Sequence, residues 1–528
     1  MAKRQGTLDT PLIQLSSSDF WTIRDSLMHK LVLGTTGSGK SSATMKHTIT
    51  SKLMAGFGLL FCIAKPEDAV SIKQLCKKAG RMKSVIEVTE AHVEFNFLAW
   101  AMARSGNINE VIDMLDHAIE IVRSSGAAPG RMGDEFWLAS KTAMLRNTIP
   151  PIWAATGTVR IEDVVAFIRT APNSLEQFKD PEWQAHSDFF RFFRMAAERL
   201  ATGVVTGFDD TAAERAISYW REIASLDSKT AGNIRITLTT ALSRFEQGLL
   251  KRMFCSGTDT VPELLFHSAI LILNVPVQVF GEDGAIAQKI WKFCTQRACL
   301  TRNALDSRQS QTPVGIVADE AHNFFYRDAE FLAQCRSSLV SVLFATQSIP
   351  TIRAMIGGEN AHDRAEHLIS NFNTVVLHSS ACPVTNTWFS NKIGRSLQTR
   401  ANFSEGEGRN FNSGMNMGEG TNWGSSSNSG GSVSFGPNGQ TTHGVSWGSG
   451  SSSGGNDSWG RNRGGGTSTN TSHGYSEAMD NIIEAGAFSR MLKTGGPANG
   501  NRVSAVWYQA GRVFRASGGN ALIVEFAQ

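Results

Sequence analysis

The sequence lacks a long apolar run and a leader-like N-terminus. No window approaches the roughly 18 apolar residues that a membrane-spanning helix needs. The best candidate, AILILNVPVQVF, is short and is broken by Pro276, so it predicts a buried strand followed by a turn. The basic residues near the N-terminus have no continuous apolar segment behind them, and we expect no signal peptide. A membrane role would therefore require a partner.

The cysteines form no pattern typical of a disulfide framework or a zinc site. There are seven of them, an odd number, and no two are spaced as CxxC. Most lie in apolar stretches such as LLFCIAK. We therefore expect buried, reduced thiols in a cytosolic protein.

The chain also lacks a strong excess of charge. It has 51 basic and 47 acidic residues, which gives a formal net charge of +4. Contact with a polyanion would therefore have to come from local basic patches. The 528 residues predict about two to four structural units, and a hydrophobic fraction of 41% allows a sizeable core.

The pattern of apolar residues divides the chain into five parts. Residues 1–98 and 256–400 alternate short apolar runs with helical patterns, which predicts an α/β domain with a parallel sheet. Residues 99–255 repeat apolar positions at helical spacing and predict an inserted all-α domain. Residues 401–476 are rich in Gly, Ser, Asn and Thr and predict a flexible insert. Residues 477–528 predict a helix and a β-hairpin that complete the core.

The insert contains a few large residues among the small polar ones. Trp423, Trp447 and Trp459 are scattered through it, and Arg461 and Arg463 precede a glycine run. Two interpretations remain open: a surface linker, which the composition favours, or an arm that binds nucleic acid or a partner.

The segment GTTGSGKSS matches the phosphate-binding pattern G-x-x-x-x-G-K-[ST], the Walker A motif. It follows an apolar run and begins a helical segment, so backbone N–H groups and the helix N-terminus would face phosphate oxygens. We expect Lys40 to contact the β- and γ-phosphates of ATP and the Ser41 hydroxyl to bind Mg²⁺. The predicted nucleotide-binding residues are Gly34, Thr35, Thr36, Gly37, Ser38, Gly39, Lys40, Ser41 and Ser42.

A second apolar run, VGIVADE, ends in two carboxylates. An NTPase with a phosphate loop needs an acidic residue at the end of such a strand, the Walker B motif. We expect Asp319 to hold Mg²⁺ through water and Glu320 to act as the general base on the attacking water. The alternative, an acidic helix cap, is less favoured because the phosphate loop lies upstream. Ala321 and His322 are expected only to begin the following turn.

Polar residues at the ends of other apolar runs are further candidates. Gln347, after LVSVLFAT, is expected to sense the γ-phosphate or the lytic water, although strand ends often carry polar residues. Lys65, Glu67, Asp68 and Asn274 follow two other runs. They would either reach the site or only cap the next helix, and both interpretations remain open.

Motor ATPases often complete the site with an arginine from a neighbouring subunit. Arg353, Arg364 and Arg395 follow the sensor strand, and Arg244 and Arg252 end the helical region. No pattern singles out one of the five, and we take Arg364 as the first candidate.

Together these motifs resemble the ATPase core of type IV secretion coupling proteins, the TraD/TraG-like branch of the FtsK–HerA superfamily. The similar segments include DFWTIRDSLMHKLVLGTTGSGKSS, GIVADEAHNFF, SVLFATQS and the C-terminal AVWYQAGRVFRASGG. IAKPEDA, VEFNFLAW and the C-terminal segment are also similar to a soluble subgroup of conjugative DNA transfer proteins. The resemblance extends over most of the chain except the insert, and it implies a RecA-like P-loop NTPase fold.

The resemblance implies a homohexameric ring that binds ATP and Mg²⁺ between subunits and moves DNA through its pore during conjugation. Lys40, Ser41, Asp319, Glu320 and Gln347 occupy the matching motif positions. Membrane-anchored coupling proteins begin with transmembrane helices, which are not expected here. We therefore expect a cytoplasmic protein that would reach the inner membrane through secretion-channel or relaxosome proteins.

Three other classes were weighed against this interpretation. The letters from Asp319 to His322 also spell the signature of DEAH-box helicases. A whole helical domain precedes them, and too few residues follow for a second helicase lobe, so that class is rejected. A viral or plasmid DNA-packaging ATPase remains an alternative. So does a nucleotide-dependent secretion ATPase or scaffold that binds no DNA directly.

Overall fold

The computed structural model describes residues 7–126, 135–203, 208–302, 311–414, 423–435, 441–453 and 462–528. The chain divides into two compact units. The first comprises Met1–Gly394 and Asn481–Gln528, and the second comprises Arg395–Asp480. Every residue that we expect in the nucleotide site belongs to the first unit.

A single large sheet forms the centre of the first unit. Among the described residues it has nine strands in the order β15-β14-β9-β3-β8-β7-β4-β6-β5. The strands from β9 to β5 run parallel, and the β14–β15 hairpin pairs antiparallel at the β9 edge. Their bounds are β3 (Lys30–Leu33), β4 (Gly58–Cys62), β5 (Val85–Val88), β6 (Ile270–Leu273), β7 (Val314–Ala318), β8 (Val340–Thr346), β9 (Thr374–Leu377), β14 (Arg502–Gln509) and β15 (Ala521–Ala527). The predicted α/β fold with a parallel central sheet and a C-terminal hairpin is confirmed.

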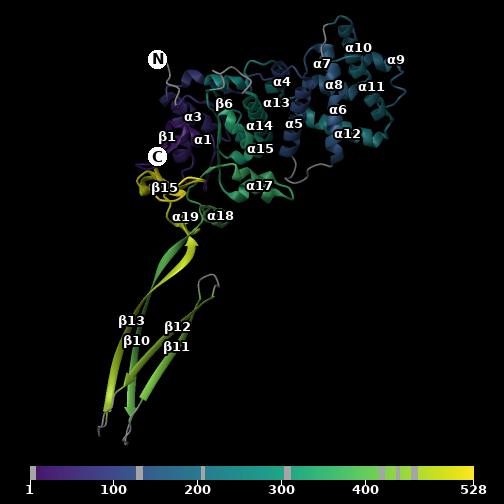
Figure 1. Ribbon diagram of the computed structural model, residues 1–528. Helices are drawn as coiled ribbons and strands as arrows, with labels where there is room; N and C mark the ends of the chain where they lie inside the picture. Colours follow the sequence, from purple (N-terminus) through teal and green to yellow (C-terminus); the bar gives the residue numbers. More distant parts are fainter. Residues whose placement is uncertain are drawn as a thin grey trace. The chain divides into compact units, whose positions relative to one another are not determined.

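Helices cover both faces of this sheet (Figure 1). Val32 belongs to an apolar cluster with residues of α2 (Lys46–Met54) and α3 (Pro66–Lys78). Leu31, the preceding residue of β3, belongs to a second cluster with α14 (Val277–Thr301). Because successive strand residues point to opposite faces, these two clusters lie on the two sides of the sheet. Strands buried on both faces explain why the sequence has continuous apolar runs here.

The region between β5 and β6 is helical (Figure 1). Its helices are α4 (Phe97–Ser105), α5 (Ile108–Gly126), α6 (Glu135–Arg146), α7 (Ile149–Thr156), α8 (Ile161–Thr170), α9 (Pro181–His186), α10 (Asp188–Ala201), α11 (Asp210–Ser225), α12 (Ser228–Ser243) and α13 (Gly248–Phe254). Residues such as Phe167, Phe189 and Trp220 pack in the same apolar cluster as α14. The helices lie where the sequence predicts them, whereas a separate domain over residues 99–255 remains a prediction.

The remaining elements of the first unit are short. They are β1 (Pro11–Gln14), β2 (Phe20–Thr22), α1 (Ile23–Ser26), α15 (Asp328–Gln334), α16 (Ile349–Ile356), α17 (Ala361–Ser370), α18 (Pro383–Ile393) and α19 (Ala487–Arg490). Over the described residues, no helix combines the length and the apolar character needed to span a membrane.

The second unit contains the insert that the sequence predicts to be flexible, and its flexibility stays a prediction. Its described residues form the strands β10 (Arg395–Gly414), β11 (Trp423–Phe435), β12 (Thr441–Ser453) and β13 (Asn462–Asn481). β10 pairs with β13, and β11 pairs antiparallel with β12. An antiparallel pair of polar strands satisfies its backbone groups by hydrogen bonds between the strands.

Candidate nucleotide-binding site

The strand order brings the predicted motifs to one edge of the sheet. β3 lies between β9 and β8, and β8 lies between β3 and β7. The carboxyl end of β3 leads into the phosphate loop, that of β8 leads into Gln347, and that of β7 leads into Asp319. Ligands bind beyond the carboxyl ends of strands in folds of this type.

The phosphate loop depends on glycines with left-handed backbone angles. The φ angles of Gly34, Gly37 and Gly39 are +153°, +77° and +90°. A Cβ atom on Gly34 would lie 2.8 Å from Cβ of His378, and one on Gly39 would lie 2.6 Å from Cγ1 of Val503. Side chains at these two positions are therefore excluded both by conformation and by space.

Lys40 is held inside the loop. Its side chain is buried, and its ammonium donates to the carbonyl oxygens of Gly34 at 2.7 Å and Thr35 at 3.1 Å. Burial lowers the pKa of Lys40, and the nearby carboxylates of Asp319 and Glu320 oppose that shift. The ammonium thus lies between the loop carbonyls and the two acidic residues.

The other loop residues are fixed to different extents. The backbone N–H and the hydroxyl of Thr35 both donate to the carbonyl oxygen of Ser379, each at 3.1 Å, which ties the loop to the segment after β9. Thr36 is exposed at the loop surface. The Ser38 hydroxyl is buried and has no hydrogen-bond partner among the described residues.

The C-terminal segment also contacts the start of the phosphate-loop helix. The Gln528 amide donates to the Ser42 hydroxyl at 3.0 Å and accepts from the Gly496 N–H at 2.8 Å. The ring of Phe526 lies 5.2 Å from that of His47 between centroids. Sequence reasoning missed the contacts with Ser42 and His47 because they join residues almost 500 positions apart.

Ser41 and Asp319 meet at the position expected for a magnesium ion. The Ser41 hydroxyl donates to the Asp319 carboxylate, whose other oxygen accepts from the Glu320 N–H at 2.9 Å. Both groups are hard oxygen donors, the type that Mg²⁺ prefers. Within the described part of the chain, no group of three acidic, histidine or cysteine residues forms a complete cation site. This donor set fits an ion that takes its other ligands from phosphates and water.

Glu320 is held in an unusual backbone conformation. Its φ and ψ angles, +48° and +47°, are left-handed, which is uncommon for a residue other than glycine. The Gln347 amide donates to Oε1 at 3.5 Å, a long contact. The other carboxylate oxygen, Oε2, is buried and has no hydrogen-bond partner among the described residues.

His322 lies close to that oxygen. Nδ1 of His322 is 3.6 Å from Oε2 of Glu320 and 3.2 Å from the Thr346 hydroxyl. Burial lowers the pKa of His322, although the carboxylates of Glu320 and Asp319 favour its charged form. The expectation that His322 only begins a turn is incomplete, because the turn Ala321–Phe324 also brings its ring beside Glu320.

Asp68 has both of the roles left open for the end of β4. Its carboxylate accepts from the Lys65 N–H at 3.1 Å and so caps α3. It also lines a cavity of about 80 Å³ together with Ser41 and Asp319. Burial raises the pKa of Asp68, and the charge of Asp319 adds to this effect.

Two of the remaining polar candidates, Glu67 and Asn274, lie in different surroundings. Glu67 is exposed. The Asn274 amide donates to Glu87 at 2.5 Å, and Glu87 forms an ion pair with Lys73 at 3.1 Å. These contacts favour a structural role for Asn274.

The candidate arginines make local contacts in this chain. Arg364 donates to the Gly357 carbonyl oxygen at 3.4 Å. Arg353 forms an ion pair with Glu366 at 3.2 Å. Arg244 pairs with Glu282 at 2.6 Å and Asp283 at 2.9 Å, and Arg252 pairs with Glu90. Arg395 is exposed. A role toward a neighbouring subunit stays a prediction for each of them.

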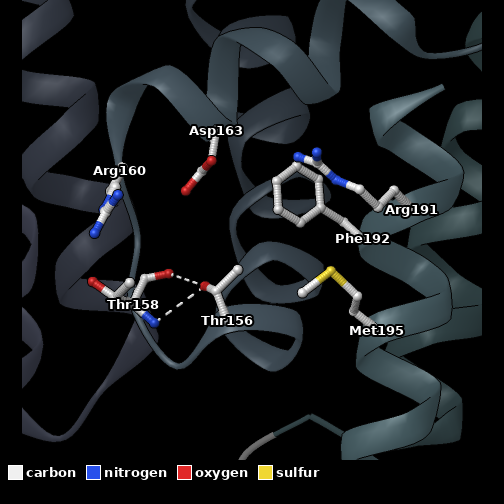
Figure 2. A pocket seen from close by; sticks show the side chains of 7 residues that line it. All are labelled: Thr156, Thr158, Arg160, Asp163, Arg191, Phe192 and Met195. Atoms are coloured by element: carbon white, nitrogen blue, oxygen red, sulfur yellow. Dashed lines mark hydrogen bonds between the residues drawn. The ribbon is translucent and has the colours of Figure 1, made fainter. Parts of the chain in front are cut away.

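A larger cavity lies in the helical region, at α7, α8 and α10 (Figure 2). Its volume is about 410 Å³, and it is lined by Thr156, Thr158, Arg160, Asp163, Arg191, Phe192 and Met195. None of the residues predicted for the nucleotide site is among them. The size of a cavity therefore does not identify the site here.

Comparison with known proteins agrees with this geometry. Residues 313–433 match the family model described as the TraM recognition site of TraD and TraG. The fold is similar to that of the bacterial conjugative coupling protein TrwBdeltaN70, unbound form, with a TM-score of 0.51 and 13% identity over 98% of this chain and 88% of that chain. No curated protein matches the sequence.

Two further structures of the same coupling protein are less similar. The form in complex with sulphate has a TM-score of 0.49 and 14% identity over 74% of this chain and 78% of that chain. The complex with ADP and Mg²⁺ has a TM-score of 0.43 and 16% identity over 71% and 75%.

The fold is a RecA-like α/β fold with a parallel central sheet. The match to the family model over residues 313–433 and the shared fold agree with the resemblance of the motifs to type IV secretion coupling proteins.

Proposed function

We propose that this protein is an ATP-hydrolysing coupling protein that moves DNA during conjugative, type IV secretion transfer. The observation that carries the proposal is the contact of Ser41 with Asp319, beside Glu320 and Lys40, at the carboxyl edge of a parallel sheet. Its fold, which is that of a conjugative coupling protein, and the family match over residues 313–433 support the same function.

The residues of the site would divide the work of hydrolysis. Ser41 and Asp319 would hold Mg²⁺, which when bound neutralises charge on the phosphates. Lys40 would exchange its loop carbonyls for phosphate oxygens. Glu320 would accept the proton of the attacking water, and Gln347, which contacts Glu320, would orient that water.

The assembly belongs to the same proposal. Six copies would form a ring with ATP between subunits and DNA in the pore, and Arg364 is our first candidate for the arginine supplied by a neighbour. The segment that matches the TraM recognition site would contact a relaxosome protein of that type. Such a partner would bring the protein to the membrane.

The proposal is tested by ATP hydrolysis with and without DNA. We expect DNA to stimulate phosphate release, and we expect the stimulation to fall steeply as salt rises from about 50 to 200 mM, because phosphate contacts release counterions. Single- and double-stranded DNA should be compared in the same series. Hydrolysis that is indifferent to both forms would contradict a DNA motor and favour a secretion ATPase or scaffold.

A further inference from the structure

The carboxylate of Glu320 is only partly held by the contacts described above. Gln347 reaches Oε1 at the long distance of 3.5 Å, and Oε2 is buried with no hydrogen-bond partner among the described residues. An unsatisfied buried carboxylate oxygen is costly, because it has lost its hydration without a replacement. A general base must also be held in position relative to the water that it activates.

His322 carries a potential donor close to this oxygen. Its Nδ1 lies 3.6 Å from Oε2 of Glu320, just beyond hydrogen-bonding distance. The same nitrogen lies 3.2 Å from the hydroxyl of Thr346, the last residue of β8, which is fully buried. The ring therefore bridges the ends of two adjacent strands, β7 and β8.

The chemistry of the ring limits what it can do. Burial lowers the pKa of His322, so the neutral ring carries one N–H group. If that proton is on Nδ1, it has two acceptors within reach, a carboxylate and a hydroxyl. The charged acceptor makes the stronger hydrogen bond, and a shift of a few tenths of an ångström would bring it within range.

We propose that His322 is a positioning residue for Glu320, donating from Nδ1 to Oε2 in the reacting state while Gln347 holds Oε1. In that state the Nδ1 proton would no longer go to the Thr346 hydroxyl. Each carboxylate oxygen would still have a lone pair for the attacking water. The inference rests on the proposed hydrolytic function, since it concerns the base of that reaction.

A role in folding alone is the competing explanation. His322 lies in a short turn, and a half-buried ring also fills space. The two explanations differ in which nitrogen matters. Asparagine carries its amide at the place of Nδ1, one bond from Cγ, whereas the longer glutamine carries its amide near the place of Nε2.

The test compares His322→Asn with His322→Gln in DNA-stimulated ATP hydrolysis. We expect His322→Asn to keep kcat within about twofold of the wild type and His322→Gln to lower it by about tenfold, with KM for ATP unchanged in both. Melting temperatures should match between the two variants. His92→Asn, at an exposed loop position, is the control for an ordinary histidine replacement.

Two results would overturn the proposal. Equal kcat values for His322→Asn and His322→Gln, whether normal or reduced, would show that a donor at Nδ1 does not matter. A change in KM without a change in kcat would place His322 in ATP binding instead. Glu320→Gln in the same assay separates the role of His322 from the proposed hydrolytic function. If Glu320→Gln blocks turnover while the two His322 variants have equal kcat values, only the role of His322 fails. If the wild type does not hydrolyse ATP, both proposals fail.

Discussion

Replacement of Lys40 and replacement of Glu320 are expected to impair different steps, nucleotide binding and turnover respectively. Lys40→Ala removes the cation that lies among the loop carbonyls, and it should abolish nucleotide binding. Glu320→Gln keeps the shape of the side chain but removes the base, so binding should persist while turnover falls by about a hundredfold or more. Fluorescent-nucleotide affinity and phosphate release measure the two effects separately. Retained turnover in Glu320→Gln would remove Glu320 from the role of base.

The glycines of the loop allow a matched comparison. Gly37 and Gly39 both have left-handed φ angles, +77° and +90°, but only Gly39 faces a neighbour, with Val503 Cγ1 at 2.6 Å from the position of a Cβ atom. Gly37→Ala should cost about 1–2 kcal/mol of stability from backbone strain alone. We expect Gly39→Ala to cost more, and Val503→Ala in the same chain to recover the difference.

Chemical denaturation of the single and double variants measures this coupling. Because Gly39 and Val503 belong to segments far apart in the chain, it also tests whether β14 lies against the phosphate loop. Equal destabilisation by the two glycine replacements, or no recovery with Val503→Ala, would contradict that packing.

At the scale of single residues, the sequence pattern predicts the place of only some members of the site. Lys40, Ser41 and Asp319 follow from fixed spacings within short motifs, and the structure brings all three together. His322 and Gln528 carry no such spacing. Their contacts exist because separate segments return to the same place, and a single sequence does not encode that proximity in a local pattern.

The segment that follows Glu320 is joined to the helical region by side-chain contacts. The Tyr326 hydroxyl donates to Glu120 of α5 at 2.6 Å, and His117 of the same helix lies 2.8 Å from that hydroxyl. Two residues later, Asp328 forms a buried ion pair with Lys292 of α14. The chain from Glu320 to the start of α15 is thus attached at two points to different helices.

This attachment predicts a response to acid. Burial alone would raise the pKa of Glu120, but hydrogen bonds from His117 and Tyr326 and the charge of Arg327 outweigh it and lower the pKa from 4.5 to about 2. A depressed pKa in the folded state stabilises the protein above the unfolded-state value, and this stabilisation is lost as pH falls from about 4.5 toward 2. Its size is moderated because the side chain is 36% exposed.

Tyr326→Phe should therefore raise the pKa of Glu120 and move acid unfolding to a higher pH. Circular dichroism between pH 7 and pH 2 measures the midpoint, with Glu120→Gln as the variant that cannot titrate at this position. We expect Glu120→Gln to flatten the dependence between about pH 4.5 and pH 2. Identical acid transitions for Tyr326→Phe and the wild type would show that the hydroxyl does not stabilise the carboxylate.

Elements with continuous apolar runs were predictable from the sequence. β3, β7 and β8 are buried along their whole length, so their runs stand out between polar turns. The strands of the second unit have no such signal, because Ser, Gly and Asn dominate them. Their pairing depends on backbone hydrogen bonds, which the pattern of apolar residues in the sequence does not reveal.

Considered as a whole, the first unit is built from segments at both ends of the chain. β14 pairs with β9 through Val506 opposite Leu377, and the C-terminal hairpin therefore completes a sheet whose first parallel strand begins at Lys30. The sequence predicted a terminal hairpin, but not its place beside β9. Its position explains why Val503 and Gln528 lie against the phosphate loop.

The chain leaves and re-enters the first unit at neighbouring points. The Ile482 N–H donates to the Gly394 carbonyl oxygen at 3.1 Å, and the Ser390 hydroxyl donates to the Ile483 carbonyl oxygen at 2.6 Å. The ends of the segment 395–480 are therefore already joined by hydrogen bonds that belong to the first unit. A linker of about three small residues would span this gap, since each residue adds roughly 3.3 Å of reach.

Replacing residues 395–480 with a Gly-Ser-Gly linker should leave the first unit folded and able to hydrolyse ATP. We expect the melting temperature to change by less than about 4 °C, because no buried contact of the sheet is removed and a shorter closed loop has lower entropy in the unfolded chain. Basal ATP hydrolysis and stimulation by DNA should be measured on the same preparation. If basal hydrolysis persists and stimulation is lost, the second unit takes part in DNA contact. If the protein no longer folds, the first unit depends on the segment, and the proposed independence of the two units is wrong.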